Sequence, residues 1–407
     1  MNMHKEAKVL NKYRNNDKAV EYGNQFWNES EHNGLAAIVA NLAGDGSLQA
    51  LNGHKFINVS CCSYLDLDSH PKIIQGAINA LNRYGVLDHC ISRIRIQIPA
   101  LLELEESLSQ LFNAKVITAI SAGAATAGIL PLLASGHLTK GSRPVMAFDK
   151  FAHFSMSLYK PVCGDETEVI TIPHNDLNAL EDLCRKYPKV AYVADGTYSM
   201  GGHTPLSDLL TLQDKYGLFL YLDDSHSLSI MGKNGEGYVR SKISEVNEDT
   251  IIVSTLNKAF GTSGAAIMFG PKGKEAEDII TRFGGPMAWS QPMNTAAIGA
   301  SLASAEIHRT AELTERQNAL SKNIRSFDKF ISTEQHGNSF PIRLVKLPND
   351  KVIECGKKLY ENGFYVSPVF FPIVAKDSAG LRVMLRAKMG DEQVLRLCEL
   401  IHQCDIS

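Results

Sequence analysis

Several kinds of segment are missing from this sequence of 407 residues. No stretch reaches the roughly 20 uninterrupted apolar residues that a membrane-spanning helix needs. The stretch 1–33 is too polar to contain the apolar core of a signal peptide. The formal net charge is only −3, so there is no electrostatic case for binding nucleic acid. We therefore expect a cytoplasmic protein that acts on small molecules, with no nucleic-acid partner and no membrane span.

Metal and nucleotide motifs are absent as well. The eight cysteines, which include the neighbours Cys61 and Cys62, lack both the dense spacing of a disulfide scaffold and any C-x-x-C metal pattern. They are expected to be reduced thiols, mostly buried, and no metal site is expected. Neither G-x-G-x-x-G nor G-x-x-x-x-G-K-[ST] occurs, which argues against dinucleotide and P-loop binding.

The length and composition are those of an ordinary globular chain with two unequal lobes. We expect an N-terminal arm over residues 1–55, a large domain over 56–298 and a small C-terminal domain over 299–407. The arm should be partly helical, with breaks at residues 15–17 and 33–34.

From about residue 56, short apolar runs alternate with longer helical patterns, which predicts an α/β fold with a mainly parallel sheet. The clearest strands are 190–194, 218–222 and 250–254, and each is followed by a polar or glycine-containing turn. Ligands bind beyond the carboxyl ends of strands in such sheets. Asp195, Asp223 and Lys258, which all follow these strands, are therefore candidates for one shared site.

After about residue 300 the pattern changes to a long amphipathic helix over 300–324. Isolated strands near 340–347 and 380–385 follow, and the chain ends in a helical pattern. This favours a separate α+β lobe.

Three short motifs could carry chemistry, and each has a structural alternative. Asp223 and His226 lie at a strand end, where an acidic residue often only caps the next helix. Lys258 lies in a turn of small residues that can desolvate its amine and make it a nucleophile, although most lysines in loops are simply solvated. The small residues 121–126 offer helix N-terminal amides for a phosphate, or merely allow close helix packing.

Taken in order, these motifs resemble the α-oxoamine synthases. This family of fold-type-I enzymes uses pyridoxal phosphate (PLP) and includes 8-amino-7-oxononanoate synthase, 2-amino-3-ketobutyrate CoA ligase, 5-aminolevulinate synthase and serine palmitoyltransferase. The matching motifs are residues 195–202, 223–226, 255–261 and 263–266, and the resemblance runs from about Tyr64 to the C-terminal helix. It implies a seven-stranded, mainly parallel sheet in the large domain, a smaller α+β C-terminal domain, PLP as cofactor, and a homodimer with shared active sites.

The resemblance also implies roles for the residues that would surround the ring. Lys258 would hold PLP as an imine and later move the substrate's α proton. Asp223 would pair with the protonated pyridine nitrogen, and His226 would hydrogen-bond the ring's 3-oxygen. His153 matches the histidine that stacks on the face of the ring.

Other matched positions would bind the phosphate and the substrates. The amides of Ala122 and Gly123 and the Thr255 hydroxyl would reach the phosphate, and Ser290 would reach it from the other subunit. Ser199 would lie near the ring oxygen or the incoming acyl group. Arg382 would grip the amino-acid carboxylate, and Tyr64 would line the substrate side.

The departures from the family pattern cluster where substrates should bind. Cys62 and Asp66 replace the asparagine and glycine of the usual Asn-x-Tyr-Leu-Gly, and residues 86–95 replace a stretch rich in glycine and serine. Gly123 stands where an aromatic residue is common, and Ala387-Lys388-Met389 follows an extra Arg386 in place of Ala-Ala-His. Residues 151–155 and 224–228 are also similar to synthases of α-hydroxyketone signals. We therefore expect a substrate from secondary metabolism or signalling.

The reaction that the resemblance implies is a decarboxylative Claisen-type condensation of a small α-amino acid with an acyl thioester, on coenzyme A or a carrier protein, giving an α-aminoketone. A PLP-dependent aminotransferase or lyase would use the same Lys258 and Asp223. A catalytically silent partner subunit is a further alternative, against which the presence of Lys258 speaks.

Overall fold

The computed structural model describes residues 12–43, 46–270 and 273–404. It divides the chain into two compact units. Residues 61–344 and 384–398 form one, called here the sheet unit, and residues 1–60, 345–383 and 399–407 form the other, called the terminal unit. The predicted division into an arm, a large domain and a small domain at residues 55/56 and 298/299 stays a prediction.

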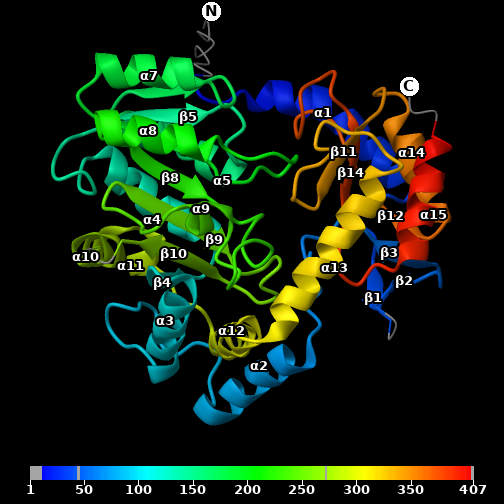
Figure 1. Ribbon diagram of the computed structural model, residues 1–407, viewed down its shortest axis with the longest axis horizontal. Coiled ribbons are helices and arrows are strands. Elements are labelled where there is room, and N and C mark those ends of the chain that lie inside the picture. The colour runs from blue at the N-terminus through cyan, green and yellow to red at the C-terminus, as the bar shows by residue number, and fades with distance from the viewer. Residues whose placement is uncertain (1–11, 44–45, 271–272, 405–407) are drawn as a thin grey trace, which may run out of the picture. The chain divides into compact units, whose positions relative to one another are not determined.

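A seven-stranded sheet forms the centre of the sheet unit (Figure 1). Its strands are β4 (Lys115–Ala119), β5 (Val145–Asp149), β6 (Val169–Ile172), β7 (Val190–Asp195), β8 (Phe219–Asp223), β9 (Thr250–Thr255) and β10 (Ala265–Phe269). Their order is β4-β10-β9-β8-β7-β5-β6. β10 is antiparallel to both of its neighbours, β4 and β9, and the other neighbouring pairs of this sheet are parallel. The predicted fold-type-I α/β architecture is confirmed.

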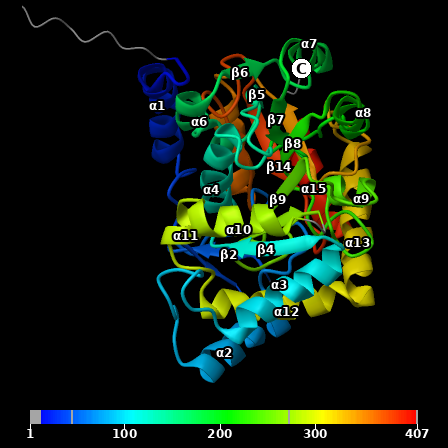
Figure 2. The same ribbon diagram turned by 90° about the vertical axis from the view of Figure 1, so that its left-hand side faces the viewer.

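Helices cover both faces of this sheet because its strands are apolar on both sides. Leu220 and Leu222 of β8 join a core with α3, α7, α8 and α12, whereas Tyr221 joins a core with α4, α6, α10 and α11. Figure 2 shows α4, α10 and α11 side by side on the second face. The helices of the unit are α2 (Pro71–Tyr84), α3 (Pro99–Phe112), α4 (Ala122–Ala134), α5 (Phe154–Ser157), α6 (Lys160–Glu166), α7 (Leu177–Lys186), α8 (Leu206–Tyr216), α9 (Tyr238–Lys242), α10 (Lys274–Phe283), α11 (Pro286–Trp289), α12 (Thr295–His308) and α13 (Ala311–Asp328).

The three strands predicted most clearly agree with β7, β8 and β9 to within one residue at either end. The single helix predicted over 300–324 is wrong, because α12 ends at His308 and α13 begins at Ala311. Thr310 has extended backbone angles, and its hydroxyl accepts a hydrogen bond from the N–H of Glu312. A threonine in this conformation caps a new helix, so the amphipathic pattern continues across a break.

The terminal unit contains a four-stranded sheet ordered β1-β2-β3-β12 and the antiparallel pair β13–β14. The predicted helix breaks hold, since Asn15 caps the start of α1 and Asn33 its end. The boundary between the units passes through β11, β14 and α15. The elements are α1 (Asn16–His32), β1 (Ala40–Leu42), β2 (Leu48–Ala50), β3 (Lys55–Asn58), β11 (Ile342–Lys346), α14 (Val352–Glu361), β12 (Phe364–Tyr365), β13 (Ser367–Val369), β14 (Gly380–Met384) and α15 (Asp391–His402).

Within the described ranges, no helix combines the length and the apolar character needed to cross a bilayer. The cytoplasmic location stays a prediction.

Candidate active site

Polar residues end the central strands of the sheet at one edge. Asp149, Asp195 and Asp223 are the last residues of β5, β7 and β8, and all three are buried. Asp195 and Asp223 are direct neighbours in the strand register. The carboxyl ends of these strands therefore gather acidic groups where the sequence predicts a ligand site.

Lys258 lies in a closed turn between β9 and the antiparallel β10. The turn is held by backbone hydrogen bonds from Leu256 N to Gly264 O at 2.9 Å and from Thr262 N to Leu256 O at 2.9 Å. Gly261 has φ of +78°, and a Cβ atom there would come within 2.6 Å of Leu67. Glycine is thus required for both the conformation and the space. The resulting turn holds Lys258 half-buried.

The Lys258 amine contacts one predicted residue, His226, and is linked through it to a second, Tyr64. Its Nζ lies 2.8 Å from His226 Nε2, and Nδ1 of the same imidazole lies 2.7 Å from the Tyr64 hydroxyl. His226 and Tyr64 are both buried. Three residues far apart in the sequence therefore form one hydrogen-bonded row.

Asp223 is tied to the Lys258 turn through Ser225. Its Oδ1 accepts a hydrogen bond from Ser225 N at 3.0 Å, and Ser225 Oγ in turn accepts one from Thr255 N at 2.9 Å. A buried carboxylate at this position can neutralise a cationic ring nitrogen. The neighbouring Asp224 faces away and accepts from Val239 N at 2.8 Å, and burial raises its pKa to about 7.

His153 caps the short helix α5 and is exposed. Its backbone N–H donates to Asp195 Oδ2 at 2.8 Å. Burial, together with the adjacent Asp223 carboxylate, raises the pKa of Asp195 well above its usual value. Its position after a strand, one strand from Asp223, makes Asp195 a predicted member of this site. The hydrogen bond from His153 N adds a role that no sequence motif indicates.

The N-terminus of α4 lies next to the Lys258 turn, because Ala119, Ala265 and Thr255 are paired across β4, β10 and β9. Ser121 caps α4 by accepting from Ala124 N. Within the described residues, no protein acceptor is recorded for the N–H groups of Ala122 and Gly123, as is usual in a first helical turn. A Cβ atom on Gly123 would meet only Ser121 Oγ, at 3.8 Å, so open space lies above these amides.

The remaining predicted residues each have their own surroundings. The Thr255 hydroxyl donates within its own turn, to Asn257 Oδ1 at 3.0 Å. Ser199 is half-buried in a tight turn closed by Tyr198 N and Gly202 O. Ser290 ends α11, and its hydroxyl donates to Gln291 O at 3.4 Å. Arg382 belongs to the terminal unit, where its buried Nε has no protein partner among the described residues.

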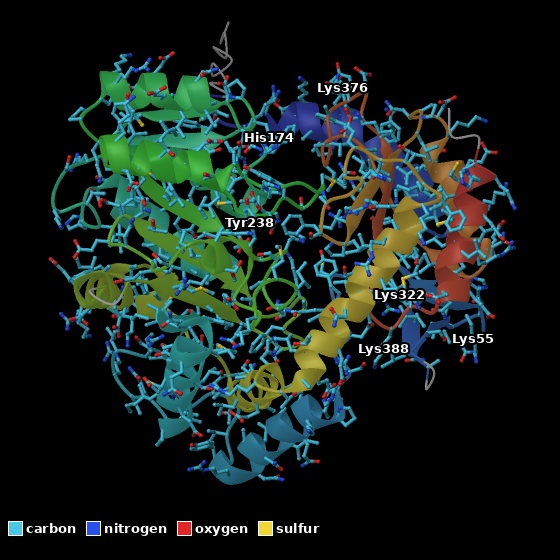
Figure 3. All side chains as sticks on the ribbon, in the orientation of Figure 1. Lys55, His174, Tyr238, Lys322, Lys376 and Lys388 are labelled. Atoms are coloured by element: carbon cyan, nitrogen blue, oxygen red, sulfur yellow. The ribbon has the colours of Figure 1, made fainter. Side chains whose placement is uncertain are left out.

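An aromatic cluster flanks the acidic edge of the sheet. His174 donates from Nδ1 to Asp149 Oδ1 at 3.0 Å and stacks on Phe151, with 4.6 Å between ring centroids. Tyr238, labelled with His174 in Figure 3, packs on His203 at 4.8 Å. No sequence motif distinguishes either histidine, so neither is a predicted site residue.

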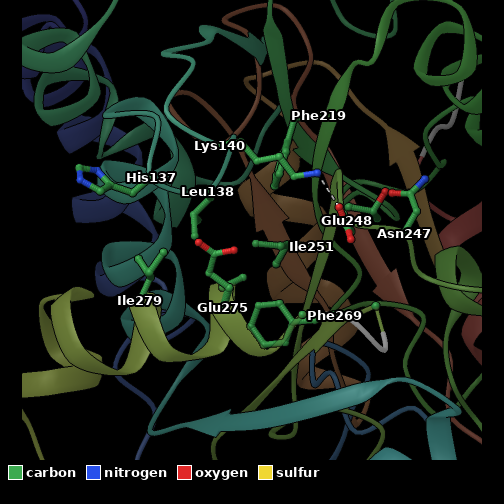
Figure 4. A pocket seen from close by; sticks show the side chains of 14 residues that line it. His137, Leu138, Lys140, Phe219, Asn247, Glu248, Ile251, Phe269, Glu275 and Ile279 are labelled. Atoms are coloured by element: carbon green, nitrogen blue, oxygen red, sulfur yellow. Dashed lines mark hydrogen bonds and ion pairs between the residues drawn. The ribbon is translucent and has the colours of Figure 1, made fainter.

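A separate pocket lies at the amino ends of β8 and β9, away from Lys258 (Figure 4). Phe219 and Ile251 line it, and Lys140 and Glu248 form an ion pair at 2.8 Å beside it. It contains none of the predicted site residues.

The residues at the carboxyl edge fit PLP. Lys258 supplies an amine, the buried Asp223 supplies a carboxylate, and the free amides with open space above Gly123 supply an anion cradle. Groups of three or more metal-ligating side chains are absent from the described residues.

The family model for aminotransferase class I and II matches residues 54–401. The chain belongs to this family. An 8-amino-7-oxononanoate synthase from Alkaliphilus metalliredigens is 28% identical over 398 residues, covering 95% of this chain and 97% of that protein. The enzyme of the same name from Treponema denticola is 26% identical over 388 residues, covering 92% and 94%.

Solved structures of this class share the fold. A serine palmitoyltransferase from S. paucimobilis, solved with PLP and myriocin bound, has a TM-score of 0.82 at 18% identity and covers 98% of each chain. The 8-amino-7-oxononanoate synthase of Francisella tularensis has a TM-score of 0.69 at 21% identity and covers 86% of this chain and 97% of that one. The predicted membership of the α-oxoamine synthases, a group of PLP-dependent acyltransferases, is confirmed.

Proposed function

We propose that this chain condenses a small α-amino acid with an acyl thioester, carried by coenzyme A or an acyl carrier protein, and releases carbon dioxide and an α-aminoketone. The observation that carries the proposal is the 2.8 Å contact of Lys258 Nζ with His226 Nε2, at the strand edge where Asp223 is buried. The relatives named 8-amino-7-oxononanoate synthase support the same class of reaction.

PLP, when bound, withdraws electrons from the substrate's α carbon. Lys258 would hold PLP covalently through its amine and would move the substrate's α proton. Asp223 would pair with the ring nitrogen and keep it protonated, and His226 would hydrogen-bond the ring's 3-oxygen. His153, whose backbone is held by Asp195, would pack against the ring.

We assign the remaining predicted residues to binding of the phosphate and the substrates. The amides of Ala122 and Gly123 and the Thr255 hydroxyl bind the phosphate. Ser199 contacts the ring oxygen or the acyl group. Arg382 binds the amino-acid carboxylate through its planar guanidinium, and its partnerless Nε within the terminal unit supports that role. Tyr64 lines the substrate side.

The reaction balances without an external oxidant or reductant. The α carbon loses its proton and bonds to the thioester carbonyl carbon, the carbon–sulfur bond breaks, and the thiol leaves with a proton. The bond from the α carbon to the carboxylate then breaks, carbon dioxide leaves, and the α carbon takes up a second proton, which comes from solvent. Lys258 is the one amine that we assign to both proton transfers.

We infer a homodimer in which Ser290 reaches the phosphate of the other subunit. Apolar side chains exposed on the sheet unit support it, since contiguous exposed apolar surface marks interaction sites. These include Val86, Leu87, Ile91, Ile94, Ile96, Phe283 and Trp289. Light scattering should give twice the chain mass of 44.6 kDa, and a fully active species of single-chain mass would contradict the inference.

We further propose that the product belongs to secondary metabolism or signalling. The support is that Cys62, Asp66 and residues 86–95 depart from the family pattern, while Lys258, Asp223 and His226 match it. Enzymes that share a cofactor site but differ in substrate lining differ in substrate.

The test is mass spectrometry of products from a panel of small amino acids crossed with acyl thioesters. We expect an α-aminoketone with equimolar thiol and carbon dioxide, and α-proton exchange in deuterium oxide when the thioester is omitted. Pyridoxamine phosphate with a keto acid would instead identify an aminotransferase. Two outcomes would contradict the proposal and favour a silent subunit. In the first, borohydride fixes no PLP to the chain. In the second, borohydride fixes as much PLP to the Lys258→Ala variant as to the unaltered chain.

A further inference from the structure

The buried Asp149 carboxylate ends β5 and accepts four hydrogen bonds. Its Oδ1 accepts from Phe151 N at 2.7 Å and from His174 Nδ1 at 3.0 Å. Its Oδ2 accepts from Asn175 N at 2.8 Å and from the Tyr192 hydroxyl at 2.9 Å. Two carboxylate oxygens offer about four acceptor sites, so the capacity of Asp149 is filled. Burial opposes its ionisation, but the hydrogen bond from His174 and those from the two backbone N–H groups lower its pKa below the ordinary value.

His174, labelled in Figure 3, reaches Asp149 as a neutral ring. Asn175 Nδ2 lies 3.2 Å from His203 O, and a carbonyl oxygen only accepts, which identifies the nitrogen end of this amide. The same Nδ2 lies 3.2 Å from His174 Nε2, which must therefore be the acceptor. The ring proton is then on Nδ1, from which it is donated to Asp149. The direction of each hydrogen bond to the carboxylate is thus fixed.

The segment that follows β5 is held at three successive N–H groups. Phe151 N donates to the Asp149 side chain, and Ala152 N donates to the Asp149 carbonyl oxygen at 3.1 Å. His153 N donates to Asp195 Oδ2 at 2.8 Å. Two residues at neighbouring strand ends therefore set the backbone from which the His153 ring projects.

We propose that Asp149 is a positioning residue for His153, the side chain assigned to the face of the PLP ring. This rests on the proposed function, because the PLP ring is what His153 would contact. His153 is exposed, and its Nδ1 lies 2.9 Å from the hydroxyl of Ser155, two residues further along the same segment. The backbone of that segment therefore largely determines where the ring lies, and Asp149 holds that backbone.

The same hydrogen bonds tie β5 to the segment after β6 and to β7, so loss of Asp149 also destabilises the fold. The two effects differ in their dependence on His153. Destabilisation acts on PLP binding whether or not the His153 ring is present, whereas positioning acts only through that ring. A double-mutant cycle separates them.

The test is fluorescence titration of the full chain with PLP. His153→Ala should weaken PLP binding about tenfold, the loss expected for one stacked ring. Asp149→Ala should weaken it by up to the same factor, and the double variant should stay within about twofold of His153→Ala alone. An unchanged affinity in Asp149→Ala, or two losses that multiply to about a hundredfold in the double variant, would overturn the positioning role.

Asp176→Ala is the matched control. Asp176 caps α7 by accepting from Ala179 N at 3.0 Å, and it directly follows one of the segments that donate to Asp149. Its loss should lower the unfolding midpoint, as for any helix cap, and should leave the PLP affinity within about twofold of the unaltered chain. A tenfold loss of affinity in this control would mean that destabilisation alone explains the result for Asp149→Ala.

His174→Phe keeps the test open if Asp149→Ala fails to fold. It retains a ring that can stack on Phe151 and removes the donor to Asp149 Oδ1. It should weaken PLP binding about threefold in the presence of the His153 ring and have no further effect in His153→Ala. An equal loss in both backgrounds would overturn the proposal.

Hydrogen exchange followed by mass spectrometry tests the hold on the backbone without the cofactor. The peptide that covers residues 150–153 should exchange about tenfold faster in His174→Phe or Asp149→Ala than in the unaltered chain, and at the unaltered rate in Asp176→Ala. Unchanged exchange in the first two variants would overturn the proposal. If the unaltered chain binds no PLP, the proposed function fails instead, and the exchange rates still show whether Asp149 holds the segment.

Discussion

Asp66 and Arg386 form a buried ion pair, with 3.1 Å between Oδ1 and Nη1 and side-chain exposures of 6% and 15%. Both residues are departures from the family pattern, and they lie 320 positions apart. Asp66 takes a position with φ of +53°, a conformation that suits the glycine usual there. The backbone conformation is therefore unfavourable for an aspartate. The ion pair with Arg386 and the hydrogen bond from Lys388 N offset this cost in free energy.

Asp66→Asn should destabilise the chain by roughly 2–4 kcal/mol, because it leaves the largely buried Arg386 guanidinium without its opposite charge. Urea unfolding followed by circular dichroism measures the change. The matched control is Asp391→Asn, which breaks the exposed pair with Lys322 on α13 (Figure 3) and should leave the unfolding midpoint unchanged. Equal effects of the two substitutions would contradict a special role for the buried pair.

Combining Asp66→Gly with Arg386→Gln should restore part of the lost stability. The double variant removes both charges and relieves the positive φ. Its loss of unfolding free energy should therefore be smaller, by about 1 kcal/mol or more, than the sum of the losses in Asp66→Gly and Arg386→Gln. Strict additivity in the cycle would mean that the two side chains are not coupled.

His308 should make the protein sensitive to acid. Burial lowers its pKa to about 4, while Nδ1 donates to Ser304 O and Nε2 accepts from Ser229 Oγ. The unfolded chain binds a proton near the ordinary value of 6.5, so the stabilisation is complete above that pH and is lost as pH falls toward 4. The full loss is on the order of 3 kcal/mol.

The unfolding midpoint of the unaltered chain should be lower at about pH 5 than at about pH 7. In His308→Gln the difference between these two midpoints should be smaller. His137→Gln is the matched control, because that residue is exposed and its ring bonds the near neighbour Ser135. An unchanged pH dependence in His308→Gln would refute the assignment.

Gly261→Ala should prevent the Lys258 turn from closing. The added Cβ would lie 2.6 Å from Leu67, at a φ of +78°. The strained φ costs about 1–2 kcal/mol, and the overlap adds roughly 1–3 kcal/mol. Gly85→Ala is the control for the strained φ alone, since Gly85 has φ of +66° and a Cβ atom there would have nothing within 4 Å. Thermal unfolding and borohydride-fixed PLP are the measurements, and similar losses in both variants would contradict the overlap.

Asp195→Asn should retain the loop that carries His153, because the amide oxygen still accepts from His153 N. It should also relieve the repulsion with Asp223 that raises the pKa of Asp195. Asp195→Ala should instead weaken PLP binding about tenfold, as expected for one lost hydrogen bond. Fluorescence titration with PLP compares the two, and equal affinities would show that Asp195 does not hold the loop.

The sequence determined the sheet and the order of its chemistry. Runs of apolar residues at 190–194, 218–222 and 250–254 can only be strands buried on both faces, and polar residues after them must gather at one edge. Lys258, Asp223 and Gly123 could therefore be named in advance. The break between α12 and α13 could not be predicted, because the amphipathic pattern continues unchanged across the helix cap at Thr310.

Contacts between distant segments were decided by the tertiary structure alone. Periodicity and local motifs assign a residue to a face or a strand end, but they do not say which side chain 162 or 320 positions away will meet it. Three contacts depend on the folded arrangement of distant segments. They are Tyr64 with His226, Asp66 with Arg386, and Asp195 with the backbone of His153.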